Sequence, residues 1–370
     1  MKALDGLGLA AVAVLTATGI AWMSPGSVTA RGIALEYSLR PDTDEYGFQP
    51  ATLEALEGKL LEKFGEHASP HLPEDLGDYD AFGMGGEEEL ARGRELYRTK
   101  CLHCHGVSGG GDGPTAKFLI PRPRNFRDGK VKFTSTLRAA KPTREDLRRT
   151  LRDGVAYTAM PSFQVEEDED IEALISYVQF LMLRGEVERL VALQIDDEGD
   201  FEDFEAGDMD AAEFSELLDE YFEEQYEYIQ DQWGSAEDEQ VFPEGPRPPA
   251  TPESIARGRR LFMSETAGCV NCHNGNGDGK GPNVYGEILD PDTGEVLRIG
   301  YKLKDEWGNE ARPADLRKGF YRGGNRPLDL YRRVHQGIKG TPMPAIADMH
   351  ANDEDIWALV NFVLSLPYNQ

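Results

Sequence analysis

The sequence predicts an all-α protein in which one small helical domain occurs twice. The motif Cys-x-x-Cys-His stands at residues 101–105 and again at 269–273, and the two copies contain all four cysteines of the chain. Each copy is followed by a segment whose apolar residues recur at helical spacing. Between the copies, residues 196–239 hold twenty acidic residues and also show helical periodicity. We therefore expect two repeated domains joined by an acidic helical connector, preceded by an N-terminal hydrophobic segment.

The Cys-x-x-Cys-His motif is the sequence at which c-type haem is attached. Two thiols three positions apart lie on one helical turn, where each can form a thioether to a haem vinyl group. The histidine that follows is then placed to ligate the iron. Because both copies are complete, the sequence predicts two covalently bound haem c groups. The cofactor-binding residues are Cys101, Cys104, His105, Cys269, Cys272 and His273.

Other uses of the cysteines explain less. A zinc site would need Cys101 and Cys104 to meet Cys269 and Cys272 across a long chain separation. Two disulfides are possible in an exported protein. A thioredoxin-like Cys-x-x-Cys would require a βαβ context, which the sequence does not indicate. None of these alternatives explains why a histidine follows both pairs, so haem attachment is the favoured interpretation.

The sequence around the two motifs is repeated in the same order. A proline follows each ligand histidine by nine residues, at Pro114 and Pro282, after a glycine-rich loop. Further on, a set of residues repeats at a constant offset of 183: Leu147, Leu151, Gly154, Met160 and Pro161 align with Leu330, Val334, Gly337, Met343 and Pro344. Each repeat then ends in a predicted helix with an apolar stripe, formed by Ile171, Leu174, Tyr177 and Val178 or by Ile356, Leu359, Phe362 and Val363.

This order resembles the class I cytochrome c family, in which an N-terminal helix, a Cys-x-x-Cys-His motif, a loop, a distal methionine and a C-terminal helix follow one another. The resemblance covers residues 87–185 and 250–370, which we expect to be two cytochrome c domains. It implies that the first and last helices of each domain cross closely at a glycine and share an aromatic contact. The residues concerned are Gly93, Tyr97 and Tyr177 in the first domain and Gly258, Phe262 and Phe362 in the second.

The resemblance also implies a methionine as the second axial ligand. Met160 and Met343 are each followed by proline, which stiffens the loop that must hold a thioether against iron. The expected metal ligands are therefore His105, Met160, His273 and Met343. In the family a proline carbonyl accepts the Nδ1–H of the ligand histidine. The candidates are Pro114 or Pro123 for His105 and Pro282 or Pro313 for His273, with Pro123 and Pro313 favoured.

The segments before the first domain are assigned by composition. Residues 1–30 contain the apolar run Leu7–Met23 and are interpreted as a signal peptide or a membrane anchor. The anchor is slightly preferred because the run carries no charge. Either assignment implies export, so we expect the protein on the periplasmic side of the cytoplasmic membrane. Residues 31–86 match neither domain and are expected to form an N-terminal arm that lies on a partner or on the first domain.

Two further segments have recognisable patterns. Residues 186–249 are expected to form the acidic connector, with an amphipathic helix over about 209–233 and a proline-rich linker. Thr251 is expected to cap the next helix, with Pro252 at its first position. In the second domain, residues 287–298 alternate in polarity around Asp-Thr-Gly and predict a β-hairpin.

The distribution of charge limits the partners. The formal net charge of −28 argues against nucleic acid, because phosphates repel such a surface. Residues 122–152 nevertheless hold eleven arginines and lysines. We hypothesise that the acidic connector or an acidic partner protein lies over this segment. The alternative is a solvated charged helix at 144–152.

Because the protein supplies both axial ligands at each iron, the sequence predicts an electron carrier and not an enzyme. The expected function is one-electron relay in a respiratory chain, with a quinol-oxidising complex, a terminal oxidase or another cytochrome as partner. No small organic substrate is expected. One alternative is an enzyme resembling the dihaem cytochrome c peroxidases, which would need an open position at one iron. Another is the cytochrome subunit of a substrate dehydrogenase.

Overall fold

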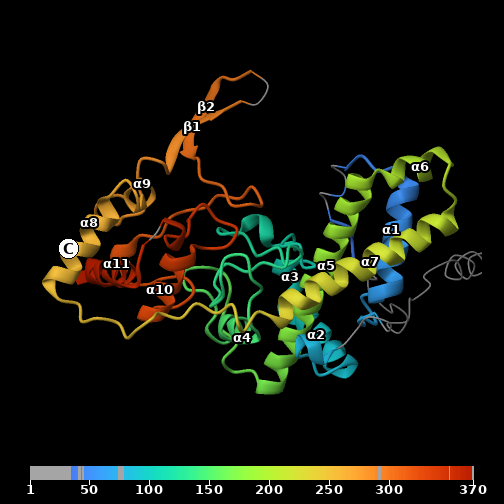
Figure 1. Ribbon diagram of the computed structural model, residues 1–370, viewed down its shortest axis with the longest axis horizontal. Helices are drawn as coiled ribbons and strands as arrows, with labels where there is room; N and C mark the ends of the chain where they lie inside the picture. The colour runs from blue at the N-terminus through green and yellow to red at the C-terminus, as the bar shows by residue number, and fades with distance from the viewer. Residues whose placement is uncertain are drawn as a thin grey trace, which may run out of the picture. The chain divides into compact units, whose positions relative to one another are not determined.

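The computed structural model is mostly α-helical, as predicted (Figure 1). It describes residues 35–40, 43, 46–73, 79–290, 293–349 and 351–368. In these ranges no helix is long and apolar enough to cross a membrane. The hydrophobic segment within residues 1–30 lies outside the described residues, so its assignment as a signal peptide or anchor stays a prediction.

The first domain is built on the crossing of its first and last helices. It contains α2 (Glu87–Lys100), α3 (Leu102–His105), α4 (Arg144–Asp153) and α5 (Asp168–Glu198). At Gly93 the absent side chain lets α2 approach the backbone of α5, since a Cβ there would lie 2.9 Å from the Cβ of Tyr177 and closer still to the carbonyl of Ala173. The rings of Tyr97 and Tyr177 lie 5.1 Å apart between centroids, which confirms the predicted aromatic contact.

The second domain repeats this crossing. Its helices are α8 (Pro252–Met263), α9 (Cys269–His273), α10 (Pro327–Gln336) and α11 (Asp353–Ser365). A Cβ at Gly258 would lie 2.8 Å from the Cβ of Phe362 and closer still to the carbonyl of Ala358. The rings of Phe262 and Phe362 lie 5.2 Å apart, as predicted. The hydroxyl of Thr251 accepts a hydrogen bond from the backbone N–H of Ser254 and caps α8, and this also confirms the prediction.

The last helix of the first domain extends beyond the boundary predicted at residue 185. α5 continues to Glu198 because its apolar residues continue at helical spacing, and Val187, Val191 and Ile195 are completely buried. This second half of α5 packs against α7 (Ala211–Gly234), with the short helix α6 (Asp200–Ala206) between them. The first part of the expected connector is therefore an extension of the first domain.

The N-terminal arm packs on this extension. Its helix α1 (Pro50–Phe64) contacts α5, α6 and α7, and Leu56, Leu60 and Phe64 on it are completely buried. The ammonium groups of two buried lysines of α1 lie within 3.2 Å of the carboxylate of Asp219 in α7. Of the two positions expected for the arm, the structure shows the one on the first domain.

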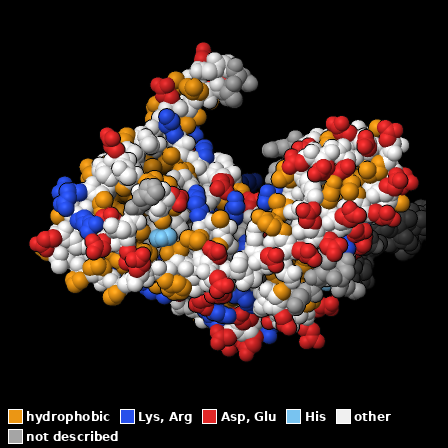
Figure 2. All heavy atoms as spheres, in the orientation of Figure 1, with side chains coloured by type: hydrophobic (Ala, Val, Ile, Leu, Met, Phe, Trp, Pro, Cys, Tyr) orange, Lys and Arg blue, Asp and Glu red, His pale blue; other side chains and the backbone are white. Residues whose placement is uncertain are grey.

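The helix predicted at about 209–233 is confirmed by α7, and its apolar stripe is buried. Phe214, Leu218 and Phe222 are each 1% exposed. Acidic side chains cover the visible outer face of the region formed by α6 and α7 (Figure 2). This amphipathic distribution holds the connector against the arm and α5 and leaves its charge in solvent.

Three arginines of the basic segment of the first domain pair with residues outside the connector. Arg144 and Arg148 both pair with Glu172 of α5, and Arg149 pairs with Asp329 of the second domain. The acidic connector therefore does not pair with these three arginines, but it does contact the segment elsewhere: Lys141 pairs with Glu186, and residues 135–137 hydrogen-bond to residues 239–241. The charges of the three arginines are matched by the neighbouring helix and by the second domain.

The predicted β-hairpin is present in the second domain. Strands β1 (Tyr285–Leu289) and β2 (Val296–Tyr301) are antiparallel, with Tyr285 opposite Tyr301. In Figure 1 the hairpin extends outward from the segment that follows α9. Leu297 and Ile299 are 61% and 65% exposed, so the hairpin does not bury its apolar side chains in the domain core.

Candidate haem sites

In the first domain the predicted cofactor residues meet around one cavity of about 290 Å³. Cys101 lines it from the junction of α2 and α3, Cys104 and His105 line it from α3, and Met160 lines it from the loop after α4. Two residues that are 55 positions apart in the chain, His105 and Met160, therefore share one site. The remaining wall is largely apolar and includes Phe126, Leu147, Leu151, Phe163, Ile175 and Val178.

Both histidines predicted as iron ligands have the same hydrogen-bonded orientation. The Nδ1 of His105 lies 3.1 Å from the carbonyl oxygen of Arg124, and the Nδ1 of His273 lies 3.2 Å from that of Ala314. A carbonyl can only accept, so Nδ1 carries the proton and Nε2 keeps its lone pair for a metal. Burial lowers the pKa of His105 to about 4 and also lowers the pKa of His273, which favours the neutral, ligating form.

The carbonyls that accept these hydrogen bonds correct a prediction. The hydrogen bond from His105 is accepted by the residue after Pro123 and not by Pro114 or Pro123. The hydrogen bond from His273 is accepted by the residue after Pro313 and not by Pro282 or Pro313. The physical reason is the glycine loop next to the motif. The carbonyl of Pro123 faces Gly111, where a Cβ would lie 2.7 Å from it, and Pro313 faces Gly279 at 2.8 Å. The next carbonyl along the chain, of Arg124 or Ala314, accepts from the histidine, and that of Ala314 also lies close to its glycine, 3.0 Å from a Cβ placed at Gly279.

The methionine loops are also repeated in their hydrogen bonds. In the first domain the N–H of Val155 donates to the carbonyl of Met160 at 3.2 Å, and the N–H of Met160 donates to the hydroxyl of Thr158 at 3.1 Å. In the second domain the matching distances, from Ile338 to Met343 and from Met343 to Thr341, are both 3.3 Å.

Sequence reasoning missed the two threonines, although a signal for them was present. Thr158 and Thr341 are related by the same offset of 183 residues that relates the methionines. The hydroxyl of each threonine also donates to a loop carbonyl, at 2.8 Å in both domains. Each threonine hydroxyl therefore makes two hydrogen bonds within its own methionine loop, and the pattern is the same in both domains.

The cysteines are suited to covalent attachment and not to the alternatives. All four are free thiols, so the two-disulfide interpretation is not what the structure shows. Within the described ranges no three His, Cys, Asp or Glu side chains converge as a metal site, so the zinc interpretation is also unsupported. Burial raises the pKa of Cys101 to about 12 and that of Cys269 to about 11, which keeps both thiols protonated.

Cationic side chains line the first cavity beside its apolar wall. Arg122, Arg124 and Lys132 come from the first domain, and Arg322 comes from the second. Burial lowers the pKa of Arg124 to about 10 and that of Lys132 to about 8. Such cations would match the carboxylates of haem propionates. A neutral histidine, a thioether, two thiols and an apolar wall complete a set of residues that fits haem c.

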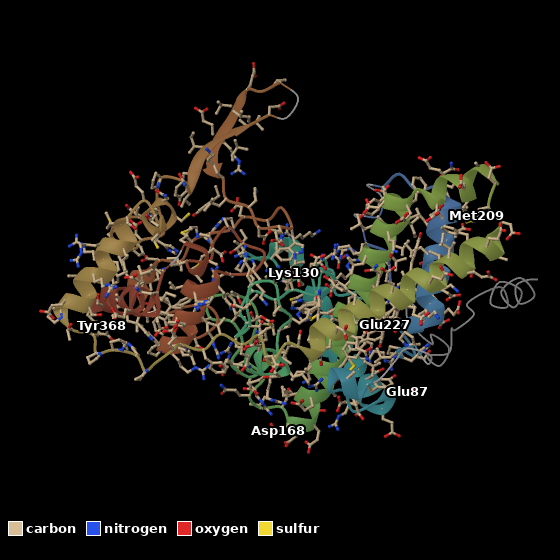
Figure 3. The ribbon with its side chains drawn as sticks, viewed as in Figure 1. Glu87, Lys130, Asp168, Met209, Glu227 and Tyr368 are labelled. Atoms are coloured by element: carbon tan, nitrogen blue, oxygen red, sulfur yellow. The ribbon has the colours of Figure 1, made fainter. Side chains whose placement is uncertain are left out.

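The two domains contact each other next to this cavity, at a surface that we call the domain interface. The guanidinium of Arg124 lies 3.7 Å from the ring centroid of Trp307, whose indole N–H donates to Asp128. At the same surface Lys130, which is labelled in Figure 3, pairs with Glu306 at 3.1 Å. Residues 305–307 of the second domain therefore cover part of the chain that holds the first site.

A buried lysine in the domain interface gives a pH prediction. Burial lowers the pKa of Lys339 from 10.5 to about 7, an effect increased by Lys141, Arg138 and Lys130 and opposed by Asp146. Between pH 7 and 10.5 the unfolded chain then binds more protons than the folded one, so the free energy of unfolding should rise with pH. The contribution of one such group is at most about 1.4 kcal/mol per pH unit.

Denaturant unfolding across this pH window measures the slope. The Lys339→Met variant should show a flatter dependence on pH than the unmodified chain. Part of the slope should remain in this variant, because the pKa of Lys132 is lowered as well. An identical slope in both proteins would contradict the assignment to Lys339.

Comparisons with known proteins agree with this geometry. A family model described as cytochrome c matches residues 90–181 and 255–367. Among solved structures, the chain is similar to a chain of the reducing HAO-like protein complex Kustc0457/Kustc0458 of Kuenenia stuttgartiensis. The sequence identity is 26% and the TM-score 0.52, over 74% of this chain and 95% of that chain. A search of curated proteins found no match.

The matched regions coincide with the two repeats and together cover more than half of the chain. They place it in the class of proteins built from small helical domains that carry covalently bound haem c. The chain is a two-domain member of the cytochrome c family, and its domains transfer electrons.

Proposed function

We propose that the protein is a dihaem electron carrier in which both irons are ligated by one histidine and one methionine. The observation that carries this proposal is the duplicated geometry of the ligand loops. In each domain a buried histidine donates through Nδ1 to a backbone carbonyl, and a methionine lies in a loop braced by a threonine. When bound, haem c supplies an iron that alternates between the ferrous and ferric states.

The protein side chains set the conditions for that exchange. The carbonyls of Arg124 and Ala314 fix the histidine tautomer and make the imidazole a better electron donor. The thioethers of Met160 and Met343 favour ferrous iron and raise the reduction potential relative to two histidines. Because a histidine and a methionine would hold each iron and leave no position open to peroxide, the proposal is a carrier and not an enzyme of the peroxidase kind.

The partner is proposed to be another redox protein. The sequence-based expectation is a respiratory chain, with a quinol-oxidising complex, a terminal oxidase or a further cytochrome on either side. The similarity to a chain from a reducing HAO-like protein complex supports the other alternative, a cytochrome subunit that serves a substrate-converting enzyme. In both cases the substrate chemistry belongs to a different chain, and this chain carries single electrons.

The location is proposed from residues 1–30 together with covalent haem. We place the protein on the periplasmic side of the cytoplasmic membrane, held by its N-terminal segment. Fractionation of cells that produce the full chain should recover it with membranes and release it only with detergent. N-terminal sequencing of the purified protein distinguishes an anchor from a cleaved signal peptide, because cleavage would remove Met1 and its neighbours.

Haem counting tests the core of the proposal. The intact mass of the purified protein should correspond to the mature polypeptide plus two haems. Replacing Cys101 and Cys104 together by alanine should remove one haem, and replacing Cys269 and Cys272 should remove the other, because each pair forms the thioethers of its own domain. Loss of both haems from either double variant would contradict independent attachment.

Spectroscopy separates the carrier from the enzyme. Redox titration should resolve two low-spin haems, each with the weak far-red absorption band of a methionine–iron bond. A high-spin haem that turns over peroxide would overturn the carrier assignment and favour the peroxidase alternative.

A further inference from the structure

The loop that carries Met343 is held by an arginine of the other domain. The guanidinium of Arg138 donates to the carbonyl of Met343 at 3.0 Å, to that of Thr341 at 3.1 Å and to that of Ile338 at 3.4 Å. One side chain of the first domain therefore binds three carbonyls of the second-domain ligand loop. A planar guanidinium is suited to this task because its donors form a rigid fork.

The start of the same loop is seated on the same segment of the first domain. The ammonium of Lys339 donates to the hydroxyl of Thr136 at 3.0 Å and to the carbonyl of Ala140, and it is 4% exposed. The side-chain amide of Gln336 donates to the carbonyl of Thr134 at 2.9 Å. Residues 134–141 thus form the surface on which the loop packs, and the side chain of Arg138 binds the middle of the loop.

Arg138 also lies close to the loop backbone at its first glycine. Gly337 adopts a φ of +73°, and a Cβ there would lie 2.5 Å from the carbonyl oxygen of Met343 and 2.7 Å from Nη1 of Arg138. At the matching glycine of the first domain, Gly154, the nearest neighbours of a Cβ would all belong to the backbone of Pro161 and Ser162, with no arginine among them. Among the described residues, no guanidinium binds the matching carbonyls of the Met160 loop. The arginine contact therefore distinguishes the two otherwise repeated loops.

We infer that Arg138 is a positioning residue for the axial ligand Met343, so that the second haem site is complete only when the first domain is docked against it. This inference rests on the proposed role of Met343 as a ligand. Arg138 acts by satisfying the loop carbonyls and by fixing the loop that holds the thioether. Its positive charge beside the loop also favours the reduced site, because reduction removes one positive charge from the iron.

The test uses the full haem-loaded chain in two variants, Met160→Ala and Met343→Ala. Each variant should keep the far-red methionine–iron band of only one haem. In the Met160→Ala background the remaining far-red band reports Met343, and in the Met343→Ala background it reports Met160. Arg138→Gln should cause loss of most of the far-red band and a downward shift of the second-haem potential in the first background. In the second background the same substitution should leave the band and the first-haem potential unchanged.

Two further variants separate positioning from charge and from general loosening of the interface. Arg138→Lys keeps the charge but loses the fork, so it should weaken the band while it lowers the potential less than Arg138→Gln does. Arg149→Gln removes the ion pair with Asp329 across the same interface without touching the ligand loop, and it should leave the band intact.

Three results would overturn the inference. If both Arg138 variants left the far-red band of Met343 and the potential of the second haem unchanged, the loop would not need Arg138 to position Met343. The proposed function would still stand. An equal loss of the band in Arg149→Gln would show that the band reports the interface as a whole. If Met343→Ala left a band in the Met160→Ala background, the ligand assignment itself would be wrong, and with it the inference.

Discussion

Replacing Met160 or Met343 by alanine is expected to lower the reduction potential of one haem and leave the other almost unchanged. Each substitution would remove from its haem the thioether that favours ferrous iron. We expect a shift of a few tenths of a volt, within the span of about 0.8 V that axial ligands cover. Redox titration with spectra of both haems measures it, and the far-red band of the altered site should disappear.

Met209 supplies a matched control for this result. It lies in the connector, where it packs against the apolar core, and the sequence context of the ligand loops is absent around it (Figure 3). Met209→Ala should leave both potentials and both far-red bands unchanged. If neither Met160→Ala nor Met343→Ala changed the spectra, the axial assignments would be wrong.

Replacing Gly93 or Gly258 by alanine is expected to destabilise the corresponding domain strongly. The added methyl group would overlap a backbone carbonyl of the crossing helix, that of Ala173 in the first domain or Ala358 in the second. A carbonyl in a buried helix cannot move aside as the end of a flexible side chain can. We expect a loss of about 3 kcal/mol, at the upper end of what overpacking costs. Denaturant unfolding followed by haem absorption measures the loss.

A glycine in an open position of a helix provides the comparison. Gly58 lies in α1, and a Cβ added there would have no neighbouring atom within 4 Å, so Gly58→Ala tests helix propensity alone. It should be neutral or slightly stabilising, by up to about 1 kcal/mol. Equal destabilisation by the alanine at Gly58 and at Gly93 would show that helix crossing is not the cause.

The features that local sequence pattern controls were predicted well. The cysteine pairs and histidines are defined by a five-residue motif, and the last helix of each domain by apolar periodicity. The close crossing of the first and last helices followed from the family resemblance. The hairpin of β1 and β2 followed from alternation around a turn sequence. Met160 was found because its repeated context has a constant offset, and the structure places it on the same cavity as His105.

The features that were missed depend on backbone orientation or on contacts between distant segments. Whether the carbonyl of Pro123 or that of Arg124 faces His105 is decided by how the glycine loop packs, which side-chain identity does not reveal. The contact of Arg138 with the Met343 loop joins positions about 200 residues apart, and an isolated arginine in a basic segment carries no periodic pattern. The length of α5 was not predicted either, because the family resemblance was used to bound the domain near residue 185 while the helix continues to Glu198.

The continuation of α5 to Glu198 has a consequence for how the two haem domains are spaced. A flexible tether would let the separation of two electron-transfer sites vary with its length and with ionic strength. Here the acidic segment is folded against α5 and α1, and the domains meet directly through contacts such as Arg149 with Asp329. Lengthening or shortening this segment would therefore disturb the first domain, while the distance an electron must cross would still be governed by the direct contact.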